Sequence, residues 1–318
     1  MLTPIALLLF VTSLAATLAA AGLFARRLDR LGVRLGIPEA VLGLLTALAA
    51  DGPELSSGLT AMVRGERGVG VGVLLGSNVF NIAAMVGMSA LLAGRVRLDR
   101  PALVVEGAFA LFATAVTAGV LFGWLPAWAA AALLAAGTAP YLVVLARGAF
   151  HGPSPPRASA PGDHVRAAQV IGLFVRELPA LAVIVIGSVG MVYTAVLLAG
   201  RYGVPRPLVG LLILATMTSL PNASTAIRLG FAGRGEALVS ETLNSNTINL
   251  AFGIVVPALF VTAARAPAGF ELDFVWMLAV TLAMLVLVGR RGGAGRLAGA
   301  AIVASYIAYV AVRIATAG

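Results

Sequence analysis

Apolar runs of about 20 residues recur along the whole of this chain, and short gaps that contain arginine separate them. Of the 318 residues, 60% are hydrophobic and only 11% are charged, which is too little polar surface for a soluble protein of this length. An apolar run of this length is sufficient to cross the hydrocarbon core of a bilayer as a helix. The pattern therefore predicts an all-α membrane protein with the lipid bilayer as its main partner.

Ten apolar runs can be delimited. They cover residues 4–24, 37–63, 69–93, 102–122, 125–146, 170–199, 204–230, 235–262, 272–289 and 296–315. No basic segment precedes the first run and its arginines follow it, so we expect a retained span and not a cleaved signal peptide. Sixteen of the 22 arginines fall on one side of this arrangement, and arginine is enriched in cytoplasmic loops. We therefore predict a multi-pass protein of the plasma (inner) membrane with both termini outside.

The gap at residues 148–169 is rich in Pro, Gly, Ser and Ala. It predicts a flexible cytoplasmic linker between a first half, residues 1–147, and a second half, residues 170–318. Both histidines, His151 and His164, lie in this gap, and a solvated linker explains them better than a pH sensor or a metal site. The absence of cysteine excludes disulfides and thiolate metal sites. The net charge of +9 is carried by arginines beside the apolar runs, so membrane orientation explains it better than a nucleic-acid partner.

The two halves contain the same motifs in the same order. GIPEAVLGLL at residues 36–45 returns as GVPRPLVGLL at residues 203–212, an offset of 167. Further along, PELSS faces PNAST, and GSNVFN faces NSNTIN, both at an offset of 168. Five predicted spans separate each motif from its copy, and an odd number of spans reverses the direction of the chain. The sequence therefore predicts ten transmembrane helices arranged as two inverted five-helix repeats, which is typical of transporters.

Each repeat carries a helix breaker inside an apolar run. The breaker reads ADGPE at residues 50–54 and TSLPN at residues 218–222. Proline removes an amide donor and clashes with the preceding turn, and carboxyl groups are too costly to leave facing lipid. We therefore expect broken helices at the membrane midplane that line a cavity. The alternative is a proline kink whose carboxylates are satisfied by neighbouring helices.

The two breakers and the two S-N-x-x-N motifs bring side-chain oxygens to one depth of the membrane. The candidates are Asp51, Glu54, Ser77, Asn78 and Asn81 in the first repeat, and Thr218, Ser219, Asn222, Ser245, Asn246 and Asn249 in the second. Hard oxygen ligands suit Na⁺, Ca²⁺ or a proton on a carboxylate, and they argue against zinc, copper or iron. For Ser77 and Ser245, holding helices together is an equal alternative. We expect Glu106 to pair at the membrane interface, and Glu241 is a weaker candidate for an ion pathway.

These motifs resemble the two alpha-repeats of the sodium/calcium exchanger superfamily, the cation/calcium antiporters. The resemblance covers residues 36–92 and 203–257, about half of the chain. It implies two inverted five-span halves, ion ligands in spans 2, 3, 7 and 8, and alternating access that exchanges Na⁺ or H⁺ for Ca²⁺. It implies no cofactor. Carried over by position, the four central ion and metal ligands are Glu54, Asn81, Asn222 and Asn249.

The second repeat departs from the pattern of this family. A typical calcium exchanger has an acid where Asn222 stands, and often another where Asn249 stands. Asp51 supplies a charge from a different place. We predict a secondary cation antiporter, most similar to a Na⁺/Ca²⁺ exchanger. The alternatives are an H⁺-coupled or monovalent cation antiporter of the same fold, and a channel or transport-inactive relative. An enzyme is disfavoured, because no G-x-S-x-G motif and no histidine occur in the spans. The oligomeric state and the exchanged ions stay open.

Overall fold

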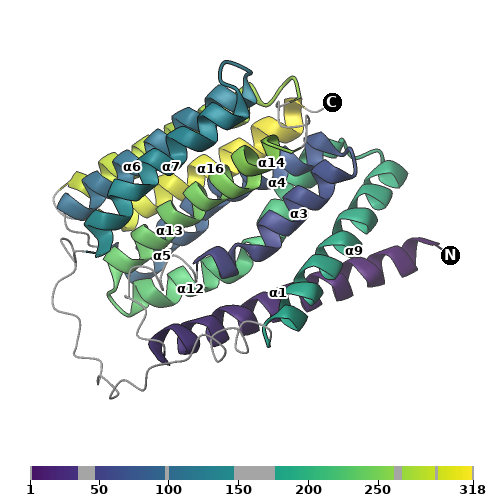
Figure 1. The fold of residues 1–318 in the computed structure, drawn as a ribbon, viewed down its shortest axis with the longest axis horizontal. Coiled ribbons are helices and arrows are strands. Elements are labelled where there is room, and N and C mark those ends of the chain that lie inside the picture. Colours follow the sequence, from purple (N-terminus) through teal and green to yellow (C-terminus); the bar gives the residue numbers. More distant parts are fainter. Residues whose placement is uncertain are drawn as a thin grey trace.

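The fold was obtained as a computed structural model, which describes residues 2–34, 47–96, 100–146, 176–260, 267–290 and 293–316. Most of these residues form long helices that lie roughly side by side (Figure 1). The predicted linker at 148–169, with both histidines, lies outside the described residues. So does the start of the first predicted repeat, residues 36–46.

The helices of the first half lie on the predicted apolar runs, except that α1 continues ten residues beyond the predicted end at residue 24. They are α1 (Leu2–Arg34), α3 (Gly52–Val63), α4 (Arg67–Asn81), the π-helical turn η1 (Ile82–Gly87), α5 (Met88–Ala93), α6 (Arg100–Leu121) and α7 (Ala127–Ala146). The residues directly before α3, 47–50, are helical as well. A short strand, β1 (Arg95–Val96), separates α5 from α6.

The second half has a similar series of elements. They are α9 (Leu178–Tyr202), α10 (Arg206–Leu208), η2 (Val209–Leu214), α11 (Ala215–Thr218), α12 (Leu220–Phe231), α13 (Gly235–Leu250), η3 (Ala251–Val255), α14 (Val256–Ala258), α15 (Glu271–Gly289), β2 (Ala294–Gly295) and α16 (Arg296–Thr316). The π-helical turn η1 begins directly after one S-N-x-x-N motif and η3 begins one residue after the other, so the two motif helices end in a similar irregular way.

Six of the described helices are long and apolar enough to cross a membrane, and the bent pair 206–218 and 220–231 makes a seventh. The protein is therefore a multi-pass, mainly helical membrane protein. The predicted total of ten spans exceeds this number for local reasons. Helix α3 has only 12 residues after its break, and α7 contributes a shorter apolar segment, Ala127–Val143. The ten-span count stays a prediction.

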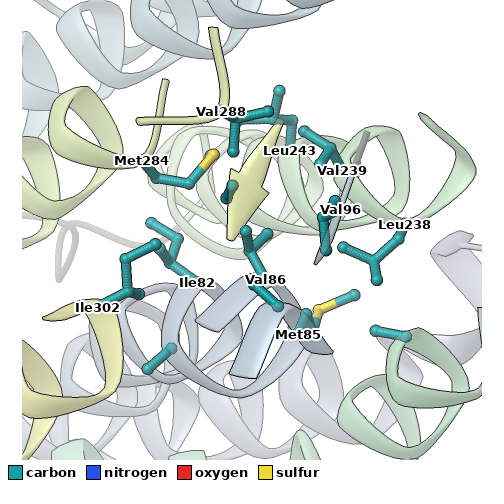
Figure 2. Close-up of a cluster of buried hydrophobic side chains, with 14 of the residues drawn as sticks. Ile82, Met85, Val86, Val96, Leu238, Val239, Leu243, Met284, Val288 and Ile302 are labelled. Atoms are coloured by element: carbon teal, nitrogen blue, oxygen red, sulfur yellow. The ribbon is translucent and has the colours of Figure 1, made fainter. Parts of the chain in front are cut away.

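Apolar packing joins the two halves around a small β ribbon. β1 pairs antiparallel with β2, Arg95 opposite Gly295 and Val96 opposite Ala294. Figure 2 shows the buried side chains that gather at this ribbon, from η1 and β1 of the first half and from α13, α15 and α16 of the second. Helices α1 and α9 cross each other along one side of the bundle (Figure 1).

The S-N-x-x-N helix of the first half crosses the π-turn of the second at backbone contact. A Cβ atom on Gly76 of α4 would overlap the Leu211 carbonyl oxygen, and a Cβ on Gly210 of η2 would overlap the Val69 carbonyl oxygen. Only glycine permits two helices to approach this closely. The crossing places the residues that follow Gly76 beside the broken helix of the other half.

Candidate cation site

The helix breaks of the two halves have the same backbone geometry. Asp51, directly before α3, has φ −78° and ψ −3°, and Ser219, directly before α12, has φ −84° and ψ −2°. The two residues are 168 positions apart, which is the offset of the repeat. Each precedes its proline by two positions, where a missing amide donor at the start of the new helix is tolerated. In the second half the segments on either side of Ser219 are bent by 47°.

The side chains at the two breaks are cross-paired. Ser219 donates a hydrogen bond to Oε1 of Glu54, and Asn222 donates one to Oδ1 of Asp51 at 2.7 Å. Glu54 and Asn222 are themselves 168 positions apart. Glu54, three residues after Asp51, thus pairs with Ser219, and Asn222, three residues after Ser219, pairs with Asp51. Such an exchange is expected for two elements related by a local two-fold axis.

The motif helices α4 and α13 add further polar contacts. Ser245 donates to Oδ1 of Asp51 at 2.7 Å. Asn81 donates to Oγ of Ser245 at 3.1 Å and to Oδ1 of Asn246 at 3.2 Å. Asn249, the counterpart of Asn81, donates to Oδ1 of Asn78 at 3.1 Å, and it also interacts with the Glu54 carboxyl. The two breaks and the two motifs thus form one connected cluster.

Oxygen atoms in this cluster are left without hydrogen-bond donors although they are buried. They are Glu54 Oε2, Asp51 Oδ2, Ser77 Oγ, Asn81 Oδ1, Asn222 Oδ1 and Asn249 Oδ1. The amide nitrogens of the three asparagines all donate within the protein, so their oxygens are the unpaired atoms. Buried polar atoms are normally satisfied, and a group of acceptors without donors is what a bare cation would complete.

Two carboxyl groups lie in this cluster, and both are fully buried. Asp51 and Glu54 interact with each other directly. Among the residues that the structure describes, neither forms an ion pair with an arginine; the ion pairs there include Arg27–Glu177, Arg206–Glu66 and Arg313–Asp273. Buried negative charge needs a compensating positive charge, so the cluster fits a cation and not an anion.

The structure brings most of the predicted site residues together, with two exceptions in detail. Ser77 is buried next to Asn78 but makes no hydrogen bond. Thr218 is buried beside Ser219, and its hydroxyl donates to the Leu214 carbonyl of its own helix at 2.9 Å. Asn78 and Asn246 have a different place from the one expected for ligands. Their side-chain oxygens accept hydrogen bonds from Asn249 and Asn81. The sequence signal for this shared role is their identical position in the two S-N-x-x-N motifs.

Two further acids differ in their surroundings. Glu241 on α13 interacts with Asp51 and with Arg228, which keeps it close to the cluster. Glu106, expected to pair at the interface, instead accepts a hydrogen bond from Ser240 at 2.7 Å and is only 7% exposed. It forms no ion pair within the described ranges, and the neighbouring helices α7 and α13 contain no arginine.

Comparison with known proteins places this chain in a family. A sequence profile described as "Sodium/calcium exchanger protein" matches residues 5–146 and 174–315. The chain belongs to the sodium/calcium exchanger family. Within the exchanger family, it is 25% identical over 295 residues to the putative antiporter CaxA of Alkalimonas amylolytica, covering 86% of this chain and 88% of CaxA. It is 26% identical over 292 residues to the inner membrane protein YrbG of Escherichia coli K12, covering 87% of each.

Solved exchangers share the fold. The sodium-calcium exchanger NCX_Mj superimposes with a TM-score of 0.65 at 18% identity, over 97% of this chain and 99% of NCX_Mj. The H⁺/Ca²⁺ exchanger CAX superimposes with a TM-score of 0.73 at 15% identity, over 96% of this chain and 82% of CAX. The likeness to each therefore extends over nearly the whole of this exchanger-family chain.

Proposed function

We propose that this protein is a secondary active cation antiporter that works by alternating access, and that it carries Ca²⁺ in exchange for Na⁺ or H⁺. The observation that carries the proposal is the set of unpaired buried oxygens on Glu54, Asn81, Asn222 and Asn249. These four residues form two pairs at an offset of 168, so the two halves contribute equally to one site. In this role the four residues bind the transported ion directly.

The charge of the cluster supports an ion that is divalent, or two that are monovalent. Asn222 and Asn249 bring no charge, so the negative charge comes from Glu54 and Asp51 alone. Because Asp51 shares hydrogen-bond donors with Glu54 through Asn222, both carboxylates belong to one site. A site with two carboxylates can neutralise one Ca²⁺ or two Na⁺ or H⁺, and this equality of charge is a basis for exchange.

The fold supports two access routes to this site. We infer ten spans in two inverted halves, residues 1–147 and 170–318, with the alpha-repeats at 36–92 and 203–257 and the cytoplasmic linker at 148–169 between them. The equal φ and ψ angles at Asp51 and Ser219 favour this symmetry. An inverted pair has two conformations of similar energy, open to opposite sides, and this is the physical requirement for alternating access. The arginine distribution favours extracytoplasmic termini.

The deciding experiment is uptake of radiolabelled Ca²⁺ by proteoliposomes that contain the purified full-length protein. One sample has an outward Na⁺ gradient at equal pH, a second has an outward proton gradient without Na⁺, and a third has neither gradient. We expect Ca²⁺ accumulation against its own gradient in the first or second sample only. The sample that accumulates Ca²⁺ identifies the coupling ion.

The same vesicles separate the rival functions. A channel would equilibrate Ca²⁺ in all three samples without accumulation, and a transport-inactive relative would show no uptake in any. Either result would contradict antiport. Accumulation of Na⁺ against a proton gradient, without any Ca²⁺ flux, would instead assign the monovalent alternative.

A further inference from the structure

The duplication includes a buried acid, an aromatic ring and a tyrosine outside the central cluster. Tyr309 on α16 donates a hydrogen bond to Oδ1 of Asp273 on α15 at 2.9 Å, and the rings of Trp276 and Tyr309 lie with centroids 5.7 Å apart. The same types of residue recur 167 or 168 positions earlier. They are Glu106 and Phe109 on α6, and Tyr141 on α7. The rings of this copy are stacked, with centroids 4.3 Å apart.

The two acids lie at opposite ends of the bundle. β1 leads into α6 and pairs with β2, which follows α15, so α6 begins at the end where α15 finishes. Glu106 lies in the second turn of α6, and Asp273 in the first turn of α15. An inverted duplication places equivalent residues in this way. The acid is therefore an inherited feature of both halves and not an isolated occurrence.

The two copies differ in how the negative charge is balanced. Asp273 forms an ion pair with Arg313, Nε to Oδ1 at 3.0 Å. The residue 168 positions before Arg313 is Leu145, so the first copy has no equivalent arginine. One oxygen of each carboxylate lacks a hydrogen-bond donor, but only Glu106 lacks a basic partner in the part of the chain that the structure describes. A buried carboxylate without positive charge is strongly unfavourable.

Within the described residues, the surroundings of Glu106 offer oxygen atoms and no positive group. Ser240 Oγ lies 2.7 Å from Oε1. Asn244 donates to the same Ser240 oxygen at 3.5 Å, and Tyr141 donates to Oδ1 of Asn244 at 2.9 Å. The charged group that faces Glu106 from α13 is the acid Glu236. The sides formed by α15 and η3 are apolar, with Leu285 against the residue after Glu106 and Val255 farther along α6.

The polar groups at this position are specific to the second half. The residues 168 positions before Ser240 and Asn244 are Gly72 and Gly76, which serve the close crossing of α4 with η2. Side chains with oxygen therefore replace glycine only on the helix that faces Glu106. This substitution breaks the symmetry of the repeat at the one place where the acid has lost its arginine.

We propose that Glu106, together with Ser240, forms a second cation site that binds one monovalent cation, a proton or Na⁺. This cation balances the charge of Glu106 as Arg313 balances the charge of Asp273. One carboxylate balances one positive charge, so a monovalent cation neutralises Glu106. Binding of this cation to Glu106 does not require an ion in the central cluster. It is linked to the central cluster through α13, because Asn244 precedes Ser245, which donates to Asp51.

The test measures thermal unfolding of the purified full-length protein in detergent, in a background of Asp51→Asn with Glu54→Gln that removes the central carboxylates. Na⁺ replaces choline at constant ionic strength and pH in one series, and pH varies without Na⁺ in the other. We expect the melting temperature to rise with the concentration of one of the two cations, and this rise to be lost when Glu106→Gln is added. The series that loses its rise identifies the cation.

Asp273→Asn in the same background is the matched control. It leaves Arg313 unpaired, so it should lower the melting temperature at every cation concentration and keep the rise. If Glu106→Gln behaves like Asp273→Asn, or if the background protein shows no rise, the proposal is wrong. Should Glu106→Gln fail to fold, Ser240→Ala decides the matter, because loss of its hydroxyl must displace the midpoint of the response. An unchanged midpoint would overturn the site.

Discussion

Asn78 and Asn246 each donate a side-chain amide hydrogen bond to the backbone carbonyl of the other, at 3.1 and 3.0 Å. The two residues are equivalent in the repeat, so this reciprocal pair lies where α4 meets α13. Their remaining oxygens accept from Asn249 and Asn81. The pair thereby fixes the amide orientation of Asn81 and Asn249 and leaves the Oδ1 atoms of these two residues unpaired. The site is thus organised by residues that need not touch the ion.

Replacement of either member of this pair should reduce stability. Asn78→Ala or Asn246→Ala leaves a buried carbonyl and a buried amide without partners, and each such loss costs about 1–3 kcal/mol. We expect the free energy of unfolding to fall by that order for each single variant. The double variant should cost about the sum of the two, because each side chain bonds the backbone carbonyl of the other, which alanine retains. Thermal unfolding measures this, with Ser224→Ala on an exposed side chain as the control. Single variants that lose no more stability than the control would contradict the pairing.

Neutralisation of Glu54 should abolish ion-driven transport. Glu54→Gln keeps the shape of the side chain but removes a charged ligand, and we expect uptake by proteoliposomes to fall about a hundredfold or more. The control is Glu66→Gln, which removes an equal charge from a surface ion pair with Arg206. Surface pairs contribute little, so Glu66→Gln should transport normally. Flux that survives in Glu54→Gln would exclude this carboxyl from the site.

An acid at position 222 should increase the preference for divalent ions. Asn222 donates to Asp51 at 2.7 Å, and an aspartate in its place would instead repel that carboxylate. Asn222→Asp should therefore lower the melting temperature in the absence of cations and enlarge the rise that Ca²⁺ produces. The rise is compared with that of the wild-type protein at equal Ca²⁺ concentrations. A smaller Ca²⁺ response in the variant would show that Asn222 lies outside the ion site.

The close crossing of α4 with η2 should tolerate no added methyl group. Gly76→Ala would force the Leu211 carbonyl away and displace Ser77 and Asn78, so we expect a cost of about 1–3 kcal/mol and loss of transport. Gly200→Ala on α9 is the control, because a Cβ there meets no atom within 4 Å. Alanine also favours a helix over glycine, so the control should be neutral or stabilising. Normal transport by Gly76→Ala would refute the crossing.

Sequence periodicity and the internal repeat could predict most helix positions and the residues of the central cluster. Helix breaks at Gly52–Pro53 and Pro221 follow from the chemistry of proline, and each appears two residues earlier, at Asp51 and Ser219. The exceptions depend on tertiary contacts. No local signal shows that Asn222 and Ser245 would bind Asp51, or that Ser240 would face Glu106. The π-helical turns have no sequence signal either, because their mixture of one glycine with apolar residues also occurs in the regular helices α6 and α15.

The ribbon formed by β1 and β2 has a consequence for how the two halves depend on each other. One strand comes from each half, and the apolar side chains around it come from both. Neither half encloses these groups by itself, so a polypeptide that ended after residue 147 would expose them. Two separately synthesised halves, by contrast, would have every contact needed to reassemble without a covalent connection. Gene fission would therefore be a tolerable event in the history of such a chain, whereas loss of one copy would not.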